Sequence, residues 1–173
     1  METTKWNQKR VYVLVGPPGS GKSTWIRERM DPTIDTHISR DNIRFSLLRP
    51  SDAYFEVEDK VRRFFLQQIK DCTSDGFTDD QVFIDATHLN PKSRAATLRQ
   101  VKNDPIKIAV SFEVPEEVAI ERNAKRTGRA LVPERVIRNM YDSFVIPTLD
   151  EGFDEIWHVD AEGVINKEVK NYE

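Results

Sequence analysis

The residues at positions 16–24 combine the types and the spacing that most clearly allow chemistry. They read Gly-Pro-Pro-Gly-Ser-Gly-Lys-Ser-Thr and directly follow an apolar run at 11–15. The three glycines let the backbone curl so that successive N–H groups point at one anion, and a helix that follows adds the positive end of its dipole. This G-x-x-x-x-G-K-[ST] pattern predicts a loop that holds the phosphates of a nucleoside triphosphate.

Individual members of this loop have separate expected roles. Lys22 supplies a mobile positive charge for the β and γ phosphates, and Ser23 places a hydroxyl where Mg²⁺ is expected. The alternative is a glycine-rich turn without a ligand, but the four fixed positions arise by chance in roughly one chain in two hundred of this length. The predicted nucleotide-binding residues of the loop are Gly16, Gly19, Ser20, Gly21, Lys22, Ser23 and Thr24.

A second candidate site is Arg40-Asp41-Asn42-Ile43-Arg44, which follows a short predicted strand at 36–39. Phosphoryl transfer to an alcohol needs a carboxylate that orients the attacking hydroxyl and accepts its proton, and Asp41 is the best-placed acidic residue. Arg44 lies three residues later, on the same helical face, where its guanidinium could hold an anionic part of the acceptor. The alternative makes Asp41 a helix N-cap and puts Arg44 in a surface ion pair.

A third candidate site begins at Asp85, which ends the apolar run 81–85. In parallel sheets ligands bind beyond the carboxyl ends of strands, so Asp85 and Thr87 are expected to bind substrate beside the phosphate loop. There Asp85 would hold a water bound to Mg²⁺ or orient the acceptor. Asp85 could equally be a capping residue, and a lone histidine such as His88 is more often a surface or structural residue.

A fourth group of charges is basic. Arg122 and Arg126 are four residues apart and therefore share one helix face. Arginines from a mobile lid stabilise the charge on a transferring phosphoryl group, and a closed lid excludes water. We expect such a lid at about 122–133. The alternative is a solvated helix face, because the stretch 121–138 holds six basic residues against two acidic ones.

Apolar runs alternate with helical periods along the chain, which is typical of an α/β protein with a parallel sheet. We expect one domain over residues 1–173, and no strong pattern after residue 160. The expected strands are 11–15, 36–39, 81–85, 106–114 and 155–159, and the expected helices are 22–30, 54–70, a helix capped by Asn90-Pro91, 115–126, and one that starts at Pro133.

Composition narrows the class of protein. The formal net charge is −3, so a broad basic face that coats nucleic acid is not expected and any contact with a polyanion should be local. Cys72 is the single cysteine, which excludes an internal disulfide framework and fits a reducing compartment. Residues 1–5 are polar and no apolar stretch reaches 18 residues, so we expect a cytoplasmic protein without a membrane segment or a secretion signal. No pattern indicates a stable protein partner.

Five motifs together resemble the kinase domain of the phage-type 5′-hydroxyl polynucleotide kinases, in order and spacing over roughly residues 10–145. They are the segments 16–25, 39–44, 85–91 and 122–126, and the pair Val132-Pro133. The resemblance implies a P-loop NTPase fold like that of adenylate kinase, with ATP and Mg²⁺ as cofactors. It implies transfer of the ATP γ-phosphate to the 5′-hydroxyl of DNA or RNA.

The same resemblance implies a role for each matching residue. Asp41 corresponds to the general base on the 5′-hydroxyl, and Arg44 to the residue that binds the phosphate 3′ of the acceptor nucleoside. Asp85 helps to shape the acceptor site. Arg126, with Arg122 beside it, contacts the transferring phosphate.

This chain departs from the family in two ways. It has no D-x-D-x-[TV] motif, so no 3′-phosphatase domain is expected, and Asp85-Ala-Thr-His replaces the more usual Asp-Thr-Asn. Either difference could mean another acceptor. Two further functions therefore stay open: a P-loop kinase for a small metabolite or nucleotide sugar, including toxin-like kinases, and an ATP-binding switch protein. DNA or RNA preference, acceptor length and oligomeric state have no signal in the residues.

Contacts with a nucleic acid beyond the reacting end could come from a few side chains. Phe45 and Tyr54 could stack on bases, although helical core packing is the expectation for both. The phosphate contacts could come from Arg40, Arg44, Arg94 and Arg99.

Overall fold

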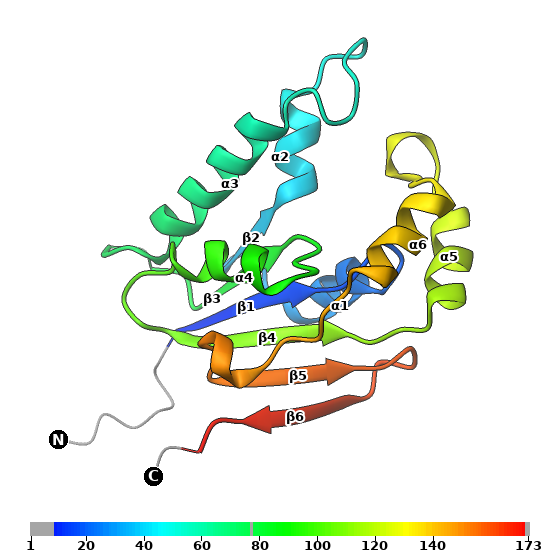
Figure 1. Cartoon of the computed structure of the whole chain (residues 1–173). Helices are drawn as coiled ribbons and strands as arrows, with labels where there is room; N and C mark the ends of the chain where they lie inside the picture. The colour runs from blue at the N-terminus through cyan, green and yellow to red at the C-terminus, as the bar shows by residue number, and fades with distance from the viewer. Residues whose placement is uncertain (1–8, 77, 172–173) are drawn as a thin grey trace, which may run out of the picture.

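A computed structural model describes residues 9–76 and 78–171 of the chain. Six strands form one sheet in the order β2-β3-β1-β4-β5-β6 (Figure 1). Neighbouring strands from β2 to β5 pair in parallel, and β6 pairs antiparallel with β5. The polar segment 1–5, which argues against a secretion signal, lies outside the described residues. Among the helices of the described part, none combines the length and the apolar character needed to cross a bilayer.

The strands are β1 (Arg10–Val15), β2 (Asp35–Ser39), β3 (Gln81–Asp85), β4 (Ile106–Phe112), β5 (Glu155–Val159) and β6 (Ile165–Val169). The helices are α1 (Lys22–Arg29), α2 (Arg40–Leu47), α3 (Glu58–Thr73), α4 (Pro91–Leu98), α5 (Glu116–Ala124) and α6 (Glu134–Asp142). Two short 3₁₀ helices are η2 (Gly128–Ala130) and η3 (Leu149–Glu151). The predicted α/β fold with a central parallel sheet is confirmed.

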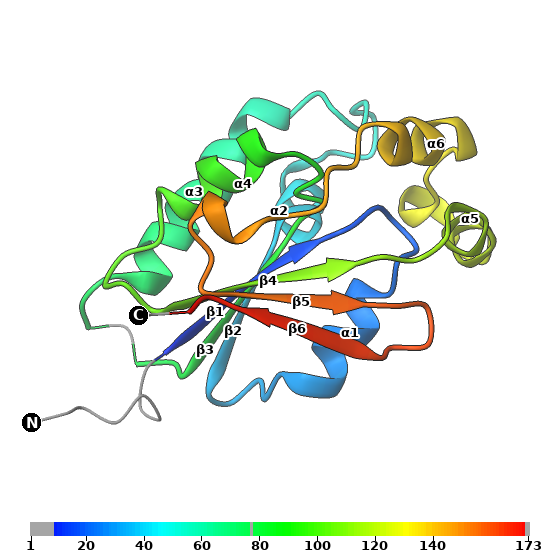
Figure 2. The same ribbon diagram turned by 60° about the horizontal axis from the view of Figure 1, so that its bottom comes forward.

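Both faces of the sheet are buried. Figure 2 shows α3 and α4 over one face and α1 over the other. Successive side chains of a strand point to opposite faces, so β1 supplies Val11, Val13 and Val15 to one core and Tyr12 and Leu14 to the other. A strand buried on both sides has to be apolar throughout, which explains the unbroken apolar run that made β1 easy to predict.

The predicted helix 54–70 is wrong at its start, because α3 begins at Glu58. Local turns take the preceding residues: the Glu56 N–H donates to the Ala53 carbonyl at 3.0 Å, and the Glu56 carboxylate accepts from the Ala53 N–H at 2.9 Å. These two hydrogen bonds close a local turn over residues 53–56, ahead of α3. Tyr54 and Phe55 therefore lie in a connecting segment.

The strand β6 was missed in the sequence, where no pattern was seen after residue 160. Its residues Ile-Asn-Lys-Glu-Val lack apolar alternation, and only Ile165 of the five is not exposed. The turn before β6 creates it: the Asp160 carboxylate accepts hydrogen bonds from the N–H groups of Glu162, at 3.0 Å, and Val164, at 2.8 Å. This Asp turn reverses the chain and lays β6 against β5.

Arg94 is fully buried, so its expected contact with a substrate phosphate is wrong. Its guanidinium donates to both carboxylate oxygens of Glu151, at 2.7 and 2.8 Å. It also donates to the carbonyls of His88, at 2.8 Å, and Val145, at 2.9 Å. The contact expected of Arg99 has no support either, because Arg99 caps the far end of α4, a whole helix away from the carboxyl end of β3.

His88 is buried and structural, which is one of the two roles expected for it. Its Nδ1 lies 2.7 Å from the Leu14 carbonyl and its Nε2 lies 2.9 Å from the Thr97 hydroxyl. Burial lowers the pKa of its imidazole to about 4, so the ring is neutral near pH 7. The neutral ring therefore donates from Nδ1 to Leu14 and accepts at Nε2 from Thr97.

Substitution of Arg94 by Leu should lower the free energy of unfolding by about 3–5 kcal/mol, because it leaves the partly buried Glu151 carboxylate and the carbonyls of His88 and Val145 without their donor. Urea unfolding measures the change. The matched control is Arg138→Leu, which breaks exposed or partly exposed ion pairs with Glu116, Glu117 and Glu134 and should cost less than about 1 kcal/mol for each pair. Equal losses in the two variants would contradict a structural role for the buried pair.

Candidate nucleotide and acceptor site

The phosphate loop joins the carboxyl end of β1 to α1. Gly21 is the N-cap of α1 at φ 100°, and no side chain accepts from the first N–H groups of the helix. The first turn of a helix has N–H groups without partners inside the helix, and a phosphate can accept from them. The loop therefore presents an uncapped helix start at the place where the sequence predicts phosphates.

Two glycines of the loop are required by close packing. A Cβ on Gly19, which has φ 80°, would lie 2.3 Å from the carbonyl oxygen of Ala119 in α5. A Cβ on Gly16 would lie 2.8 Å from the hydroxyl of Ser20, which itself donates to the Pro17 carbonyl at 2.7 Å. The absence of side chains thus lets α5 approach the loop.

Lys22 lies at the centre of the charged groups. Its ammonium donates to the carbonyls of Gly16, at 2.7 Å, and Pro17, at 2.9 Å. Burial lowers its pKa to about 8, while the nearby carboxylates of Asp85 and Asp41 act to raise it. The positive charge of Arg126 acts in the opposite direction and lowers the pKa of Lys22. The fold thus gathers predicted residues from four separate segments around one ammonium group.

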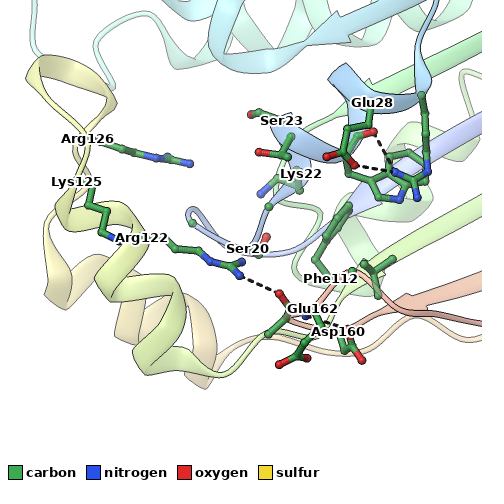
Figure 3. A pocket seen from close by; sticks show the side chains of 18 residues that line it. Ser20, Lys22, Ser23, Glu28, Phe112, Arg122, Lys125, Arg126, Asp160 and Glu162 are labelled. Carbon is green, nitrogen blue, oxygen red and sulfur yellow. Dashed lines mark hydrogen bonds and ion pairs between the residues drawn. The ribbon is translucent and has the colours of Figure 1, made fainter.

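A pocket of about 540 Å³ opens beside the phosphate loop (Figure 3). Figure 3 shows Arg122 and Arg126 extending from α5 and the residues after it toward the loop. Arg122 donates to the Ala161 carbonyl at 2.9 Å. Gly16 lies outside the lining and contributes the carbonyl that holds Lys22. The predicted nucleotide-binding residues that line the pocket are Gly19, Ser20, Gly21, Lys22, Ser23, Thr24, Arg122 and Arg126.

The turn between β5 and β6 forms another wall of this pocket, and the sequence reasoning missed it. Residues 160–163 line the pocket, and the Ala161 carbonyl holds Arg122. The signal was present, since Asp-Ala-Glu-Gly is a turn sequence that directly follows the last predicted strand. Like Asp85, residues 160–163 lie at the carboxyl end of a predicted strand, which is where ligands bind in parallel sheets.

Asp41 is free to act because a neighbour caps its helix. Ser39 is the N-cap of α2 and accepts from the Asn42 N–H at 3.2 Å, so the N-cap alternative for Asp41 is wrong. The Asp41 carboxylate instead accepts from Arg44 at 2.5 Å and from the Tyr54 hydroxyl at 3.2 Å. Its side chain remains 64% exposed. Asp41 is thus oriented by two donors and accessible to a substrate.

Arg44 forms the ion pairs considered for it, but its guanidinium is buried and not at the surface. One guanidinium nitrogen contacts Asp41 and the other donates to Glu58 at 2.8 Å. Burial by itself would lower the pKa of Arg44, but the hydrogen bond with Glu58 and the nearby Tyr54, Glu58 and Asp41 groups together outweigh it, and the pKa is raised. Glu58 also pairs with Arg40. These contacts join α2 to the start of α3 and fix the Asp41 carboxylate.

Asp85 lies at the carboxyl end of β3, and the capping alternative for it is wrong because Asn90 caps α4 and accepts from the Ser93 N–H at 2.9 Å. The Asp85 carboxylate lies 3.1 Å from Nε2 of His37, a contact that no sequence pattern indicated. Thr87 is bound to the phosphate loop through its carbonyl, which accepts from the Gly16 N–H at 2.9 Å.

The predicted lid reaches across to the segment after α2. Arg129, in η2, donates to the carbonyls of Arg49, at 3.1 Å, and Pro50, at 3.0 Å. Residues 125–133 therefore connect α5, which carries Arg122, with the segment that leads from Asp41 to Tyr54. In the described part of the chain, no cluster of three or more His, Cys, Asp or Glu side chains could hold a metal ion.

This fold, with its phosphate loop and the arginines beside it, is that of a nucleotide-binding P-loop kinase. Residues 11–147 match the model of the AAA_33 family, an AAA domain, and the chain belongs to that family. The resemblance stated from the motifs is therefore confirmed at the level of the P-loop kinase domain.

Two curated relatives cover most of the chain. Transcription factor bHLH140 of Arabidopsis thaliana is 28% identical over 94% of this chain and 17% of that protein. A putative bifunctional polynucleotide phosphatase/kinase of Acanthamoeba polyphaga mimivirus is 27% identical over 88% of this chain and 33% of that protein. The chain thus spans a third or less of the length of either relative.

Solved structures share the fold at low sequence identity. A chain of the Pnkp1/Rnl/Hen1 RNA repair complex is 20% identical over 83% of this chain and 46% of that one, with a TM-score of 0.64. A gluconokinase from Sinorhizobium meliloti 1021 is 19% identical over 89% and 83%, with a TM-score of 0.59. A fungal RNA kinase is 16% identical over 87% and 74%, with a TM-score of 0.55. Kinases of nucleic acids and of sugars therefore share this architecture.

Nucleotide affinity should depend on pH through Lys22. The ammonium titrates near pH 8 in the free protein, and phosphates next to it raise the pKa, so nucleotide binding takes up a proton above pH 8. The affinity for ADP should therefore be constant near pH 7 and fall by up to about tenfold per pH unit above 8. Calorimetric titration from pH 6.5 to 9.5 measures the slope.

The control for this titration is Lys22→Arg, which keeps the positive charge and stays protonated over the whole range. Its Kd for ADP should lack the fall above pH 8, whatever its absolute value. The same slope in both proteins would assign the pH dependence to another group.

Proposed function

We propose that this domain transfers the γ-phosphate of ATP to the 5′-hydroxyl of DNA or RNA. The observation that carries the proposal is the Asp41 carboxylate, which is exposed, oriented by Arg44 and Tyr54, and close enough to Lys22 to act on its pKa. A carboxylate so placed can accept the proton of an attacking hydroxyl beside the phosphate loop. The mimivirus relative, named a putative polynucleotide phosphatase/kinase, supports this acceptor over others.

The remaining residues fit the needs of the transfer. The N–H groups of the phosphate loop and Lys22 hold the β and γ phosphates, while Arg126 and Arg122 face the charge that develops on the transferring group. Asp41 accepts the hydroxyl proton as the new O–P bond forms and the bond to ADP breaks. Asp85 and Thr87 line the acceptor side.

The donor set suits Mg²⁺. Ser23 lies in the first turn of α1 with its side chain exposed to the pocket, and Mg²⁺ prefers one or two protein oxygens together with phosphates and water. Ser23 would hold the ion, with Asp85 binding one of its waters. When bound, the ion neutralises charge on the β and γ phosphates.

Asp41→Asn should lower kcat by roughly 10² to 10⁴, the usual contribution of a positioned base, while ADP affinity stays near that of the native protein. The measurement is transfer of label from [γ-³²P]ATP with Mg²⁺ to a short 5′-hydroxyl oligonucleotide. The matched control is Asp104→Asn, which should keep full activity. Asp104 is an exposed carboxylate just before β4, at the amino ends of the parallel strands and away from the phosphate loop. Full turnover by Asp41→Asn would remove Asp41 from the role of base.

Acceptor identity can be tested at Arg44. Because Arg44 also holds the Asp41 carboxylate, Arg44→Ala should lower kcat for every acceptor. If Arg44 binds the phosphate 3′ of the acceptor nucleoside as well, the variant should in addition raise the KM for a nucleoside 3′-phosphate by at least about tenfold, and the KM for an unphosphorylated nucleoside less. Arg44→Lys keeps a charge between Asp41 and Glu58 and controls for collapse of that network. An unchanged acceptor KM would favour a small-molecule kinase, as would labelling of sugars but not of oligonucleotides.

A further inference from the structure

Three aromatic side chains meet beside Asp41: Phe45 at the exposed side of α2, and Tyr54 and Phe55 in the segment before α3. The rings of Phe45 and Tyr54 have centroids 6.2 Å apart at 69°, and those of Tyr54 and Phe55 are 4.8 Å apart at 86°. We call Phe45, Tyr54 and Phe55 the aromatic corner. Phe45 is 38% exposed and Phe55 is 64% exposed, so the core packing expected for Phe45 is wrong.

The aromatic corner is fixed to the candidate general base. The Tyr54 hydroxyl lies 3.2 Å from the Asp41 carboxylate, and the Arg44 guanidinium lies 4.7 Å from the centre of the Tyr54 ring and 6.0 Å from that of Phe55. Burial raises the pKa of Tyr54, so its hydroxyl stays protonated and keeps donating to Asp41. Whatever carries the hydroxyl that approaches Asp41 must therefore lie near these rings.

Within the described residues, the exposed ring of Phe55 does not contribute to the packing of either hydrophobic core. Neither core cluster includes a member of the aromatic corner. Covering a phenylalanine ring contributes about 1.5–3 kcal/mol, so an exposed ring next to a reaction site is available to a ligand with a flat apolar face.

Positively charged side chains lie in the same part of the molecule as the aromatic corner. Arg129 contacts the carbonyls of Arg49 and Pro50, a few residues before Phe55, and Arg126 belongs to the same lid segment. A ligand on the aromatic corner therefore meets rings with the Arg44 guanidinium beside them, and the lid contacts the segment that leads to these rings. Flat bases joined by phosphates match both kinds of group, and this pairing is the usual basis of single-strand binding.

We propose that the aromatic corner binds a nucleobase of the acceptor end, with the ring of Phe55 as the main stacking surface and Phe45 beside it. This inference rests on the proposed polynucleotide kinase function and specifies its substrate as an end whose base has a free face. A base inside a duplex already stacks on both faces, so Phe55 can take only a base of an unpaired end or the outer face of a terminal pair.

The kinetic test compares Phe55→Ala with Phe64→Ala, a matched loss of a phenylalanine that is 55% exposed on α3. Stacking is typically strong enough that Phe55→Ala should raise the KM for a single-stranded 5′-hydroxyl trinucleotide by roughly 5- to 100-fold, with kcat little changed. Phe55→Trp, which keeps a stacking surface, should restore a low KM. Phe64→Ala should behave like the native protein.

The acceptor is varied in parallel. For the native protein, trinucleotides with an abasic residue at the first or second position identify the stacked base, and one of them should show the high KM of Phe55→Ala. Phe55→Ala should no longer distinguish that abasic acceptor from the intact one. Equal KM values of the native protein for intact and abasic acceptors would overturn the proposal, as would equal values for Phe55→Ala and Phe64→Ala.

A binding experiment separates this inference from the proposed function. A trinucleotide with 2-aminopurine at the stacked position, or at both positions in turn, should lose fluorescence on binding the native protein and not on binding Phe55→Ala. If Phe55-dependent quenching occurs without any labelling by ATP, the nucleobase site stands and the kinase proposal falls. If labelling occurs without quenching or base dependence, the kinase proposal stands and the nucleobase site is overturned. Failure of both overturns both.

Discussion

The arrangement of the site depends on the buried hydrogen bonds made by His88 and Arg94, which we call the polar brace. His88 joins the loop after β3 to the Leu14 carbonyl of β1, and Arg94 holds the His88 carbonyl while it pairs with Glu151. Because both side chains are nearly inaccessible to water, every one of these polar groups has to be bonded for the fold to be stable. The loop that carries Thr87 is thereby held against the phosphate loop, and the carboxylate of Asp85 is brought near Lys22.

A second network of hydrogen bonds positions the carboxylate of Asp41, on the candidate acceptor side. Ser39 takes the capping role at α2, which leaves Asp41 free for Arg44 and Tyr54. Arg44 is in turn held by Glu58 at the start of α3. The carboxylate is thus positioned from two elements rather than one. Phe65 of α3 links the two networks, because its ring lies 6.1 Å from the His88 ring and 5.9 Å from the guanidinium of Arg40, which pairs with Glu58.

The sequence was sufficient to predict those elements for which the local residue pattern and the tertiary structure agree. The phosphate loop, the strand before it and Asn90 as a cap follow from backbone requirements that a few residues meet, so they could be predicted without a structure. Burial of Arg94 could not, because its partner Glu151 is distant in the chain and a charge is usually exposed. The exposure of Phe45 was unpredictable for the converse reason, since apolar residues on a helix are usually packed inside.

The contact between Arg129 and the segment after α2 is made to backbone carbonyls and not to side chains. A carbonyl is present whatever residue occupies the position, so the side chains at positions 49 and 50 can diverge without loss of the acceptor groups that Arg129 uses. Surface segments of this kind change quickly among related proteins. The segment between α2 and α3 can thus change its side chains while its contact with Arg129 is kept.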